Sequence, residues 1–331
     1  MRNLNNGKAE SQELRDLTKT GKQRNWRGKK IRNLKYAELL EDIGMPKSVR
    51  VKHCADKLIF KKTSNGRLKL HQAWFCKSRL CALCNWRRAM KHSNQVAKML
   101  DTALETKPKA RFLFITFTVK NVSAEELGKA ILKLSQAFTK LMKYAKVAKN
   151  LLGYMRVIEV TVNNENGTYH PHIHALLMVK SSYFKSSANY IEQTEWLLFW
   201  RQAMKLDYMP VVDVRTIKPK DSASDTLASA KEVAKYPVKD TEYMSYDHRE
   251  NMSRIIALEN GLTGKRLISY GLLFKEIRRK LKLEDVETDS DLIKTLDDDE
   301  EEKTKGEEII AIWNNVRKNY FLSQDYPFLY R

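Results

Sequence analysis

Hydrophobic and polar positions follow a regular alternation of strand and helix patterns through the middle of the chain. Runs rich in β-branched and aromatic side chains predict strands over residues 111–119, 153–162, 169–179 and 211–217. Helices are predicted over residues 85–105, from the capping-box pattern Ser123 to Glu126 toward Asn150, around Trp196 and Trp200, and over 224–236. From residue 111 onward the order is therefore β-α-β-β-α-β-α.

This order predicts an α+β fold, in which one mainly antiparallel sheet carries helices on a face in the ferredoxin-like or split βαβ arrangement. Residues 163–168 (NNENGT) have strong turn chemistry and predict a hairpin between the second and third strands. We expect four segments: a basic arm over 1–50, a cysteine-rich segment over 51–107, the sheet domain over 108–245, and a mostly helical C-terminal region over 246–331. The last segment contains an acidic linker, 284–308, and a final aromatic helix with Trp313 and Tyr320.

Charge narrows the class of partner. The chain has 61 Lys and Arg against 40 Asp and Glu, a formal net charge of +21, which favours a polyanion such as nucleic acid. Residues 1–50 are strongly basic, and both a solvated tail and a DNA-binding arm fit them.

No apolar run approaches the length needed to cross a bilayer, and residues 1–8 lack the apolar region of a signal peptide. We expect a cytoplasmic protein with no membrane partner.

All four cysteines of the chain lie close together in sequence: Cys54, Cys76, Cys81 and Cys84. In a reducing compartment this clustering favours a zinc site over disulfides. A Cys₃His site with His53 or His71 and a set of reduced thiols are the alternatives. A structural site here would hold basic side chains where they contact DNA phosphates, and the candidates are Arg79, Arg87 and Arg88.

Three of the seven histidines, His170, His172 and His174, occupy alternate positions of a predicted strand and so share one face. Imidazoles spaced in this way can reach one divalent ion, although solvent-facing histidines would show the same pattern. Glu159, in the middle of an apolar strand, is the candidate third ligand, with an ion pair to a residue such as Arg156 or to a helix lysine as the alternative. A six-residue loop over 164–169 would place Glu159 opposite His174. An odd loop would turn it to the other face.

The segment 230–239 (AKEVAKYPVK) places Glu232 one helical turn before Tyr236. Both side chains can address one phosphate there, and the positive charges of Lys235 and Lys239 favour the phenolate and hold a phosphodiester. Pro237 places the phenol in the last turn of its helix. A merely packed tyrosine is the alternative, and the nearby Tyr243 and Tyr246 are natural comparisons.

Three motifs in order, FLFITFT at 112–118, HPHIHALLMV at 170–179 and EVAKYPVK at 232–239, resemble those of plasmid rolling-circle replication initiators of the HUH endonuclease superfamily, Gram-positive small-plasmid type. The resemblance implies that His172 and His174 hold Mg²⁺ or Mn²⁺ and that Tyr236 cleaves origin DNA, single-stranded or in a hairpin, leaving a 5′-phosphotyrosine and a 3′-OH primer. It also implies that Glu232 is the general base of the terminating cleavage. Pro237 departs from the family pattern, which more often has a small polar residue there.

Two other functions fit parts of the pattern: an HUH single-strand transposase, and a zinc-bearing DNA-binding regulator without catalysis. The order histidines then Tyr236 argues against a relaxase. No G-x-x-x-x-G-K-[ST] loop occurs in the sequence, so unwinding would fall to a host helicase, together with host DNA polymerase and single-strand binding protein. A homodimer is one option for the oligomeric state.

Overall fold

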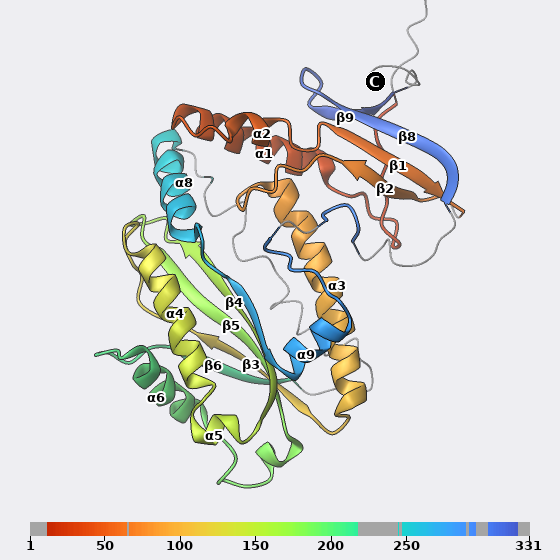
Figure 1. Cartoon of the computed structure of the whole chain (residues 1–331). Coiled ribbons are helices and arrows are strands. Elements are labelled where there is room, and N and C mark those ends of the chain that lie inside the picture. Colours follow the sequence, from red (N-terminus) through yellow and green to blue (C-terminus); the bar gives the residue numbers. More distant parts are fainter. Residues whose placement is uncertain are drawn as a thin grey trace, which may run out of the picture. The chain divides into compact units, whose positions relative to one another are not determined.

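A computed structural model describes residues 12–64, 66–217, 244, 247–288, 291–295 and 304–323. The chain forms two compact units, Met1–Arg87 with Asp291–Arg331, and Arg88–Ser290. Each unit contains its own antiparallel sheet (Figure 1). This division differs from the four predicted segments because a strand that follows the acidic stretch pairs with a strand next to the cysteines.

The larger unit is built on a five-stranded antiparallel sheet in the order β6-β3-β5-β4-β7. The strands are β3 (Arg111–Phe117), β4 (Leu151–Val162), β5 (Tyr169–Val179), β6 (Val212–Ile217) and β7 (Ile268–Leu272). The α+β class and the antiparallel sheet are thereby confirmed, and the first four strands lie where the sequence predicts them. The predicted helix over 224–236 lies outside the described residues.

Helices cover both faces of this sheet (Figure 1). On one face, α3 (Ala82–Thr106) and α9 (Leu273–Lys280) bury an apolar core that includes Met99, Met155, Leu176 and Phe274. On the other face, α4 (Leu127–Leu141) and α6 (Gln193–Met204) place Phe138, Trp196 and Trp200 around Phe117. Within the described part of this unit, the remaining helices are α5 (Ala145–Ala148), the 3₁₀ turn η1 (Ser181–Phe184) and α8 (His248–Leu262).

The smaller unit packs α1 (Trp26–Asp42) and α2 (Ser48–Lys52) with a four-stranded antiparallel sheet in the order β2-β1-β8-β9. The strands are β1 (Lys57–Thr63), β2 (Leu68–Ala73), β8 (Thr304–Asn314) and β9 (Asn319–Leu322). Trp26 is the centre of this packing: its ring lies edge-on to Phe60 and Tyr320, with centroids 6.3 and 6.4 Å away, and its indole N–H donates to Asp16.

The chain ends differ in part from the expectations. Residues 26–42 of the basic segment form the helix α1, whose Trp26, Tyr36 and Leu40 are buried, so this part is not a solvated tail. The expectation of a final helix is wrong. Trp313 and Tyr320 lie on strands β8 and β9 and not on a final helix. The C-terminal region is therefore not mostly helical.

The strand β7 is a further departure from the expected helical C-terminal region. Gly271 permits it, because a Cβ atom at that position would lie 2.1 Å from the ring of Tyr154 on the neighbouring strand β4. A side chain at this position would require the Tyr154 ring to move. Among the described residues, no helix combines the length and apolarity that a membrane crossing requires.

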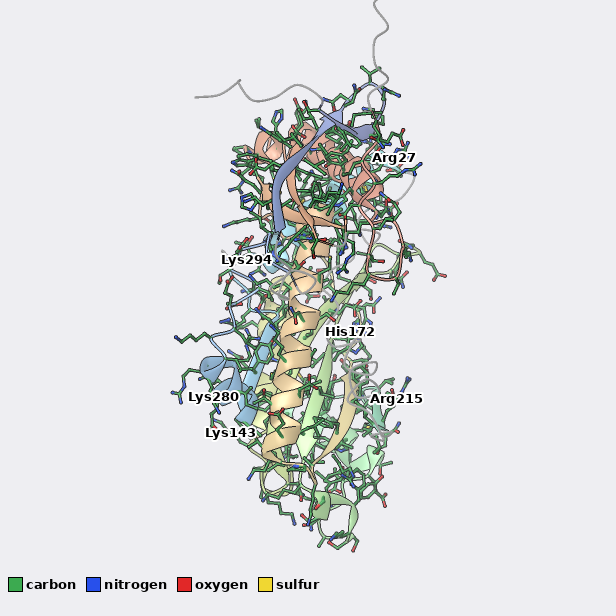
Figure 2. All side chains as sticks on the ribbon, turned by 90° about the vertical axis from the view of Figure 1, so that its right-hand side faces the viewer. Arg27, Lys143, His172, Arg215, Lys280 and Lys294 are labelled. Carbon is green, nitrogen blue, oxygen red and sulfur yellow. The ribbon has the colours of Figure 1, made fainter. Side chains whose placement is uncertain are left out.

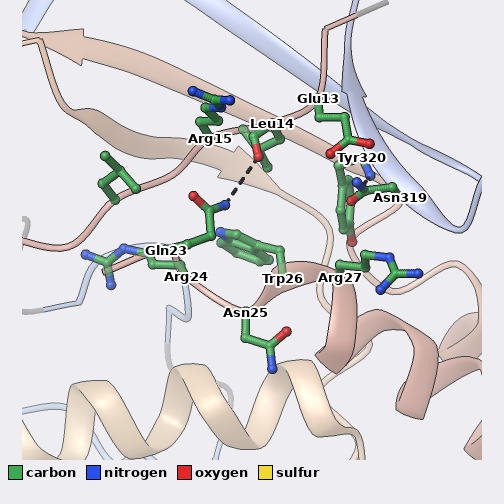
Figure 3. A pocket seen from close by; sticks show the side chains of 11 residues that line it. Glu13, Leu14, Arg15, Gln23, Arg24, Asn25, Trp26, Arg27, Asn319 and Tyr320 are labelled. Atoms are coloured by element: carbon green, nitrogen blue, oxygen red, sulfur yellow. Dashed lines mark hydrogen bonds between the residues drawn. The ribbon is translucent and has the colours of Figure 1, made fainter. Parts of the chain in front are cut away.

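Basic residues of the N-terminal segment line a recess of about 610 Å³ in the smaller unit (Figure 3). Arg15 and Arg27 are exposed at its rim, and Arg24 pairs with Asp16 at 3.3 Å. Trp26 is buried beneath them. The positive charge of this segment is thus held on a folded surface.

Candidate functional site

Strand β5 presents its histidines to one face of the larger sheet. His170, His172 and His174 alternate with residues of the opposite face, where Ile173, Ala175 and Leu177 are fully buried and α4 packs against the strand. Pro171 is the third residue of β5, ahead of the stretch that pairs with β3, so its missing N–H removes no bond of that ladder.

The hairpin register brings Glu159 to the same face. The loop has six residues, 163–168, and is closed by a hydrogen bond from the Asn163 N–H to the Thr168 carbonyl. An even loop keeps Glu159 on the histidine face, but the pairing is displaced by two residues from the expected one: Glu159 lies opposite His172, not His174. Glu159 is buried beside the two rings and does not pair with Arg156 in the described contacts.

The three side chains form a compact set of ligand atoms. Nε2 of His174 lies 3.2 Å from Nε2 of His172 and 3.1 Å from Oε2 of Glu159, and the third edge measures 3.8 Å. Neighbouring ligands of an octahedral ion with bonds of about 2.1 Å stand roughly 3.0 Å apart. Two imidazoles and one carboxylate on one face would leave three coordination positions for phosphate and water, and this mixed donor set suits Mn²⁺ better than Mg²⁺.

The other ring nitrogens hold both imidazoles in place. Nδ1 of His172 lies 3.1 Å from the His170 carbonyl, and Nδ1 of His174 lies 3.1 Å from the hydroxyl of Thr116 on β3. Such contacts fix the tautomer and aim Nε2 at the shared centre. Thr116 is not among the residues that the sequence predicts for the site, although a hydroxyl in the apolar strand FLFITF is a signal that could have marked it.

Burial, and next to it the neighbouring His174, lower the pKa of His172 to about 4. The imidazole is therefore neutral at pH 7, and its Nε2 lone pair is available to a cation. Burial also lowers the pKa of His170. Glu159 supplies the negative charge that a divalent ion requires. The remaining predicted site residues of this unit, Glu232, Lys235, Tyr236 and Lys239, lie outside the described residues.

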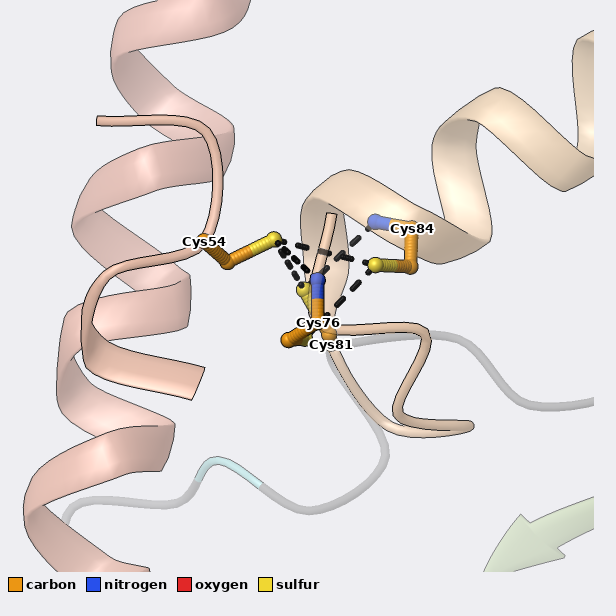
Figure 4. A group of neighbouring side chains, drawn as sticks. All are labelled: Cys54, Cys76, Cys81 and Cys84. Carbon is orange, nitrogen blue, oxygen red and sulfur yellow. Dashed lines mark hydrogen bonds between the residues drawn. The ribbon is translucent and has the colours of Figure 1, made fainter. Parts of the chain in front are cut away.

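The four cysteines form a second candidate metal site, in the smaller unit (Figure 4). Their sulfur atoms lie 3.6 to 3.7 Å apart in three pairs, Cys54 with Cys81, Cys54 with Cys84, and Cys76 with Cys84. A tetrahedral zinc ion with Zn–S bonds of about 2.3 Å separates its sulfurs by roughly 3.8 Å. A disulfide would need about 2.05 Å. The geometry therefore fits a Cys₄ zinc site.

The surroundings of this cluster are compatible with thiolate ligands of a bound cation. All four side chains are buried, and the N–H groups of Cys76 and Cys84 point to Cys54 Sγ and Cys81 Sγ. Burial raises the pKa of the Cys54 thiol, so without a cation this thiol stays protonated. His53 and His71 are exposed and bonded elsewhere, to Asp56 and near Glu308 respectively, so neither joins the set.

The predicted phosphate-contacting arginines divide into two groups. Arg87 and Arg88 are buried, and the guanidinium of Arg87 donates to the carbonyls of Leu292 and Ile293. Arg87 thus contacts the segment that returns after the acidic residues 284–288, and both guanidinium groups are turned inward. Arg79 is half-buried beside the cysteines.

The fold and the triad define an α+β protein whose antiparallel sheet carries a His₂Glu cluster that could hold a cation. A sequence profile of the replication protein family matches residues 67–321, and the chain belongs to this family. It is 47% identical to Protein rep of Lentilactobacillus hilgardii over 93% of this chain and 98% of that protein. It is 48% identical to Protein rep of Lactiplantibacillus plantarum over 94% and 99%.

A shorter relative, Replication protein of Staphylococcus aureus, is 49% identical over 71% of this chain and 100% of its own length. No solved structure matches the chain. The resemblance drawn from the three sequence motifs is confirmed at the level of the family.

Proposed function

We propose that this protein starts rolling-circle replication of a plasmid by nicking one strand at the double-strand origin, with Tyr236 as the nucleophile. The proposal rests above all on the convergence of His172, His174 and Glu159 on one face of the five-stranded antiparallel sheet, in a chain of the replication protein family. Two imidazoles and a carboxylate at this spacing suit a cation that binds a phosphodiester.

In the proposed reaction the phenol oxygen of Tyr236 attacks the scissile phosphorus, and the bond from phosphorus to the 3′ oxygen breaks. The phenol proton passes to solvent and the departing 3′ oxygen takes one up, so that a free 3′-OH primer and a 5′-phosphotyrosine result. The bond energy stays in the covalent link, and the step needs no ATP. The same chemistry in reverse rejoins the strand after one round.

Within this scheme His172, His174 and Glu159 hold Mg²⁺ or Mn²⁺, which when bound neutralises charge on the scissile phosphate and polarises it. Lys235 and Lys239 bind the phosphodiester near the phenol. Glu232 takes a proton from the water that ends the round, or orients that water. Thr116 positions His174 through its hydroxyl.

We also propose that Cys54, Cys76, Cys81 and Cys84 bind one structural Zn²⁺, on the sulfur spacing given above. The plasmid origin, single-stranded or extruded as a hairpin, would be the DNA partner. Host helicase, DNA polymerase and single-strand binding protein would act on the primer in the cytoplasm.

The test is incubation of the purified protein with a labelled single strand that carries the origin of its plasmid, with and without Mn²⁺, followed by a denaturing gel. Wild type should form a metal-dependent covalent adduct that Tyr236→Phe does not form. Tyr243→Phe and Tyr246→Phe are the matched controls, and both should retain the adduct.

Retention of the adduct by Tyr236→Phe, with loss in one of the two controls, would assign the nucleophile elsewhere. Metal-dependent cleavage followed by joining to a second strand that lacks the origin sequence would favour a single-strand transposase. Binding with no adduct under any metal would favour a DNA-binding regulator.

A further inference from the structure

The strand register places β6 residues beside the cation site. Thr116 on β3 pairs with His174 on one side and with Asp213 of β6 on the other. Phe114, two residues earlier, pairs with Arg215. Paired residues share a face of the sheet, so Asp213 and Arg215 lie on the face that carries His172 and His174. At about 4.8 Å per strand, Asp213 is roughly 10 Å from His174 across the sheet.

The two halves of this face differ in exposure. Toward β7, Met155 and Val157 are buried under α3 and α9. Toward β6, Thr116 is half-buried, and the side chain of Arg215 is 73% exposed. Figure 2 looks onto this face and shows His172 and Arg215 to one side of α3. A polar, accessible floor therefore leads from the triad to β6 in the described part of the chain.

Arg215 is held in a defined orientation on this floor. Its Nε donates to Asp213 at 2.7 Å, which leaves the two terminal nitrogens as donors. A guanidinium presented in this way matches two oxygens of one phosphate. An exposed ion pair contributes little to stability, so the fold itself gives small reason for this pair.

We propose that Arg215, positioned by Asp213, binds a backbone phosphate next to the scissile one in the single strand that the enzyme cuts. The inference rests on the proposed nicking function for the identity of the strand. Arg215 lies on the same sheet face as His172 and His174. A guanidinium there can bind a phosphate next to the one that the cation site is proposed to bind.

The first test measures binding, so that it does not depend on cleavage. Fluorescence anisotropy in EDTA would give the Kd of the full chain for a 30-nucleotide single strand across the origin at several salt concentrations. Arg215→Gln should weaken binding roughly tenfold and lower the slope of log Kd against log salt by about 0.7, the value for one phosphate contact on single strands. Arg215→Lys should lie between the two.

The matched control is Arg266→Gln. Arg266 forms an exposed ion pair with Asp285 just before β7, the strand at the opposite edge of the same sheet. This variant removes the same charge from the same unit, and it should keep the affinity and salt slope of the wild type. Equal losses in both variants would mean a general effect of net charge and would overturn the inference.

The second test locates the contact. Each phosphate in turn is replaced by a neutral methylphosphonate, and one replacement near the nick should weaken wild type by the factor seen with Arg215→Gln, while causing no further loss in that variant. Additive losses at every position, or an Arg215→Gln protein that binds like wild type, would overturn the inference. A wild type that binds with this pattern but never forms an adduct would reject nicking while keeping the Arg215 contact.

Discussion

The hydroxyl of Thr116 lies 3.1 Å from Nδ1 of His174, on the side of the ring away from Glu159. The His174 ring, on β5, is thereby held between Thr116 of β3 and Glu159 of β4, with its Nε2 aimed at the cation centre. The site consequently uses three adjacent strands, β3, β5 and β4, although only two of them supply ligands.

Removing this hydroxyl should weaken metal binding without unfolding the sheet. Thr116→Val keeps the shape, and we expect the Mn²⁺ concentration for half-maximal adduct formation to rise about tenfold, the usual effect of losing such a supporting contact. Thr116→Ser should restore the wild-type value. An unchanged Mn²⁺ requirement in Thr116→Val would show that His174 needs no support from β3.

Glu159 should be essential for metal binding because it supplies the only negative charge in the triad. Glu159→Gln keeps the volume and hydrogen bonding, so the metal-free protein should unfold at nearly the wild-type temperature. The stabilisation that Mn²⁺ gives the wild type in a thermal unfolding experiment should be absent. Glu165→Gln, in the exposed hairpin loop, is the control and should respond to Mn²⁺ like wild type. Full Mn²⁺ stabilisation of Glu159→Gln would remove it from the ligand set.

Burial of His172 predicts a pH dependence of stability for the metal-free protein. Its pKa is about 4 in the folded state and 6.5 in the ordinary state, so between these values the unfolded chain binds more protons. The free energy of unfolding should therefore rise from pH 4 to 6.5 and level off above, by at most about 3 kcal/mol from this residue. The lowered pKa of His170 acts in the same direction.

Urea unfolding in EDTA at several pH values would measure this dependence. His172→Gln should flatten the curve. A wild-type stability that stays constant from pH 4 to 6.5 would contradict the buried neutral state of His172.

The sequence pattern predicted the residues of the candidate cation site better than it predicted the structure around that site. Alternation of His170, His172 and His174 fixes their common face, and an even hairpin loop suffices to add Glu159, even though the loop begins one residue earlier than expected. A displacement by two residues changes the partner but not the face. The local sequence pattern was therefore enough to predict the site, because side chains alternate between the two faces of a sheet every two residues.

Long-range pairing was beyond the same reasoning. The local pattern around Trp313 and Tyr320 predicts a helix. The segment is a strand because β8 pairs with β1, which is far away in sequence. The sequence predicts that Arg87 contacts DNA, but its guanidinium donates to the carbonyls of Leu292 and Ile293. In both cases the deciding contact comes from a distant part of the chain, which no local pattern contains.

The cysteine cluster should bind one zinc per chain, which can be measured by releasing the metal with a mercurial in the presence of a zinc indicator dye. Cys84→Ser should lose the metal and unfold the smaller unit at lower temperature, because zinc binding and folding are coupled. His71→Ala should keep one equivalent, since this histidine lies outside the sulfur cluster. Loss of zinc in His71→Ala would instead indicate a Cys₃His site.

Tyr320 should stabilise the cysteine loop from the distant strand β9. Its hydroxyl donates to the carbonyl of Ala55 at 2.8 Å, next to Cys54, and burial raises its pKa well above the ordinary value, so the group stays a donor. Tyr320→Phe leaves that carbonyl buried and unpaired, and we expect a loss of about 1–2 kcal/mol in the free energy of unfolding.

The variant should keep its zinc but release it faster to a chelator, because Ala55 has φ +55°, a conformation that needs outside support, and Tyr320 supplies part of it. Tyr190→Phe, at an exposed tyrosine of the larger unit, is the control and should change neither property. Wild-type stability and zinc release in Tyr320→Phe would show that the loop is held by its remaining backbone bonds, from the Ala55 N–H to the Trp74 carbonyl and from the Trp313 N–H to the Asp56 carbonyl.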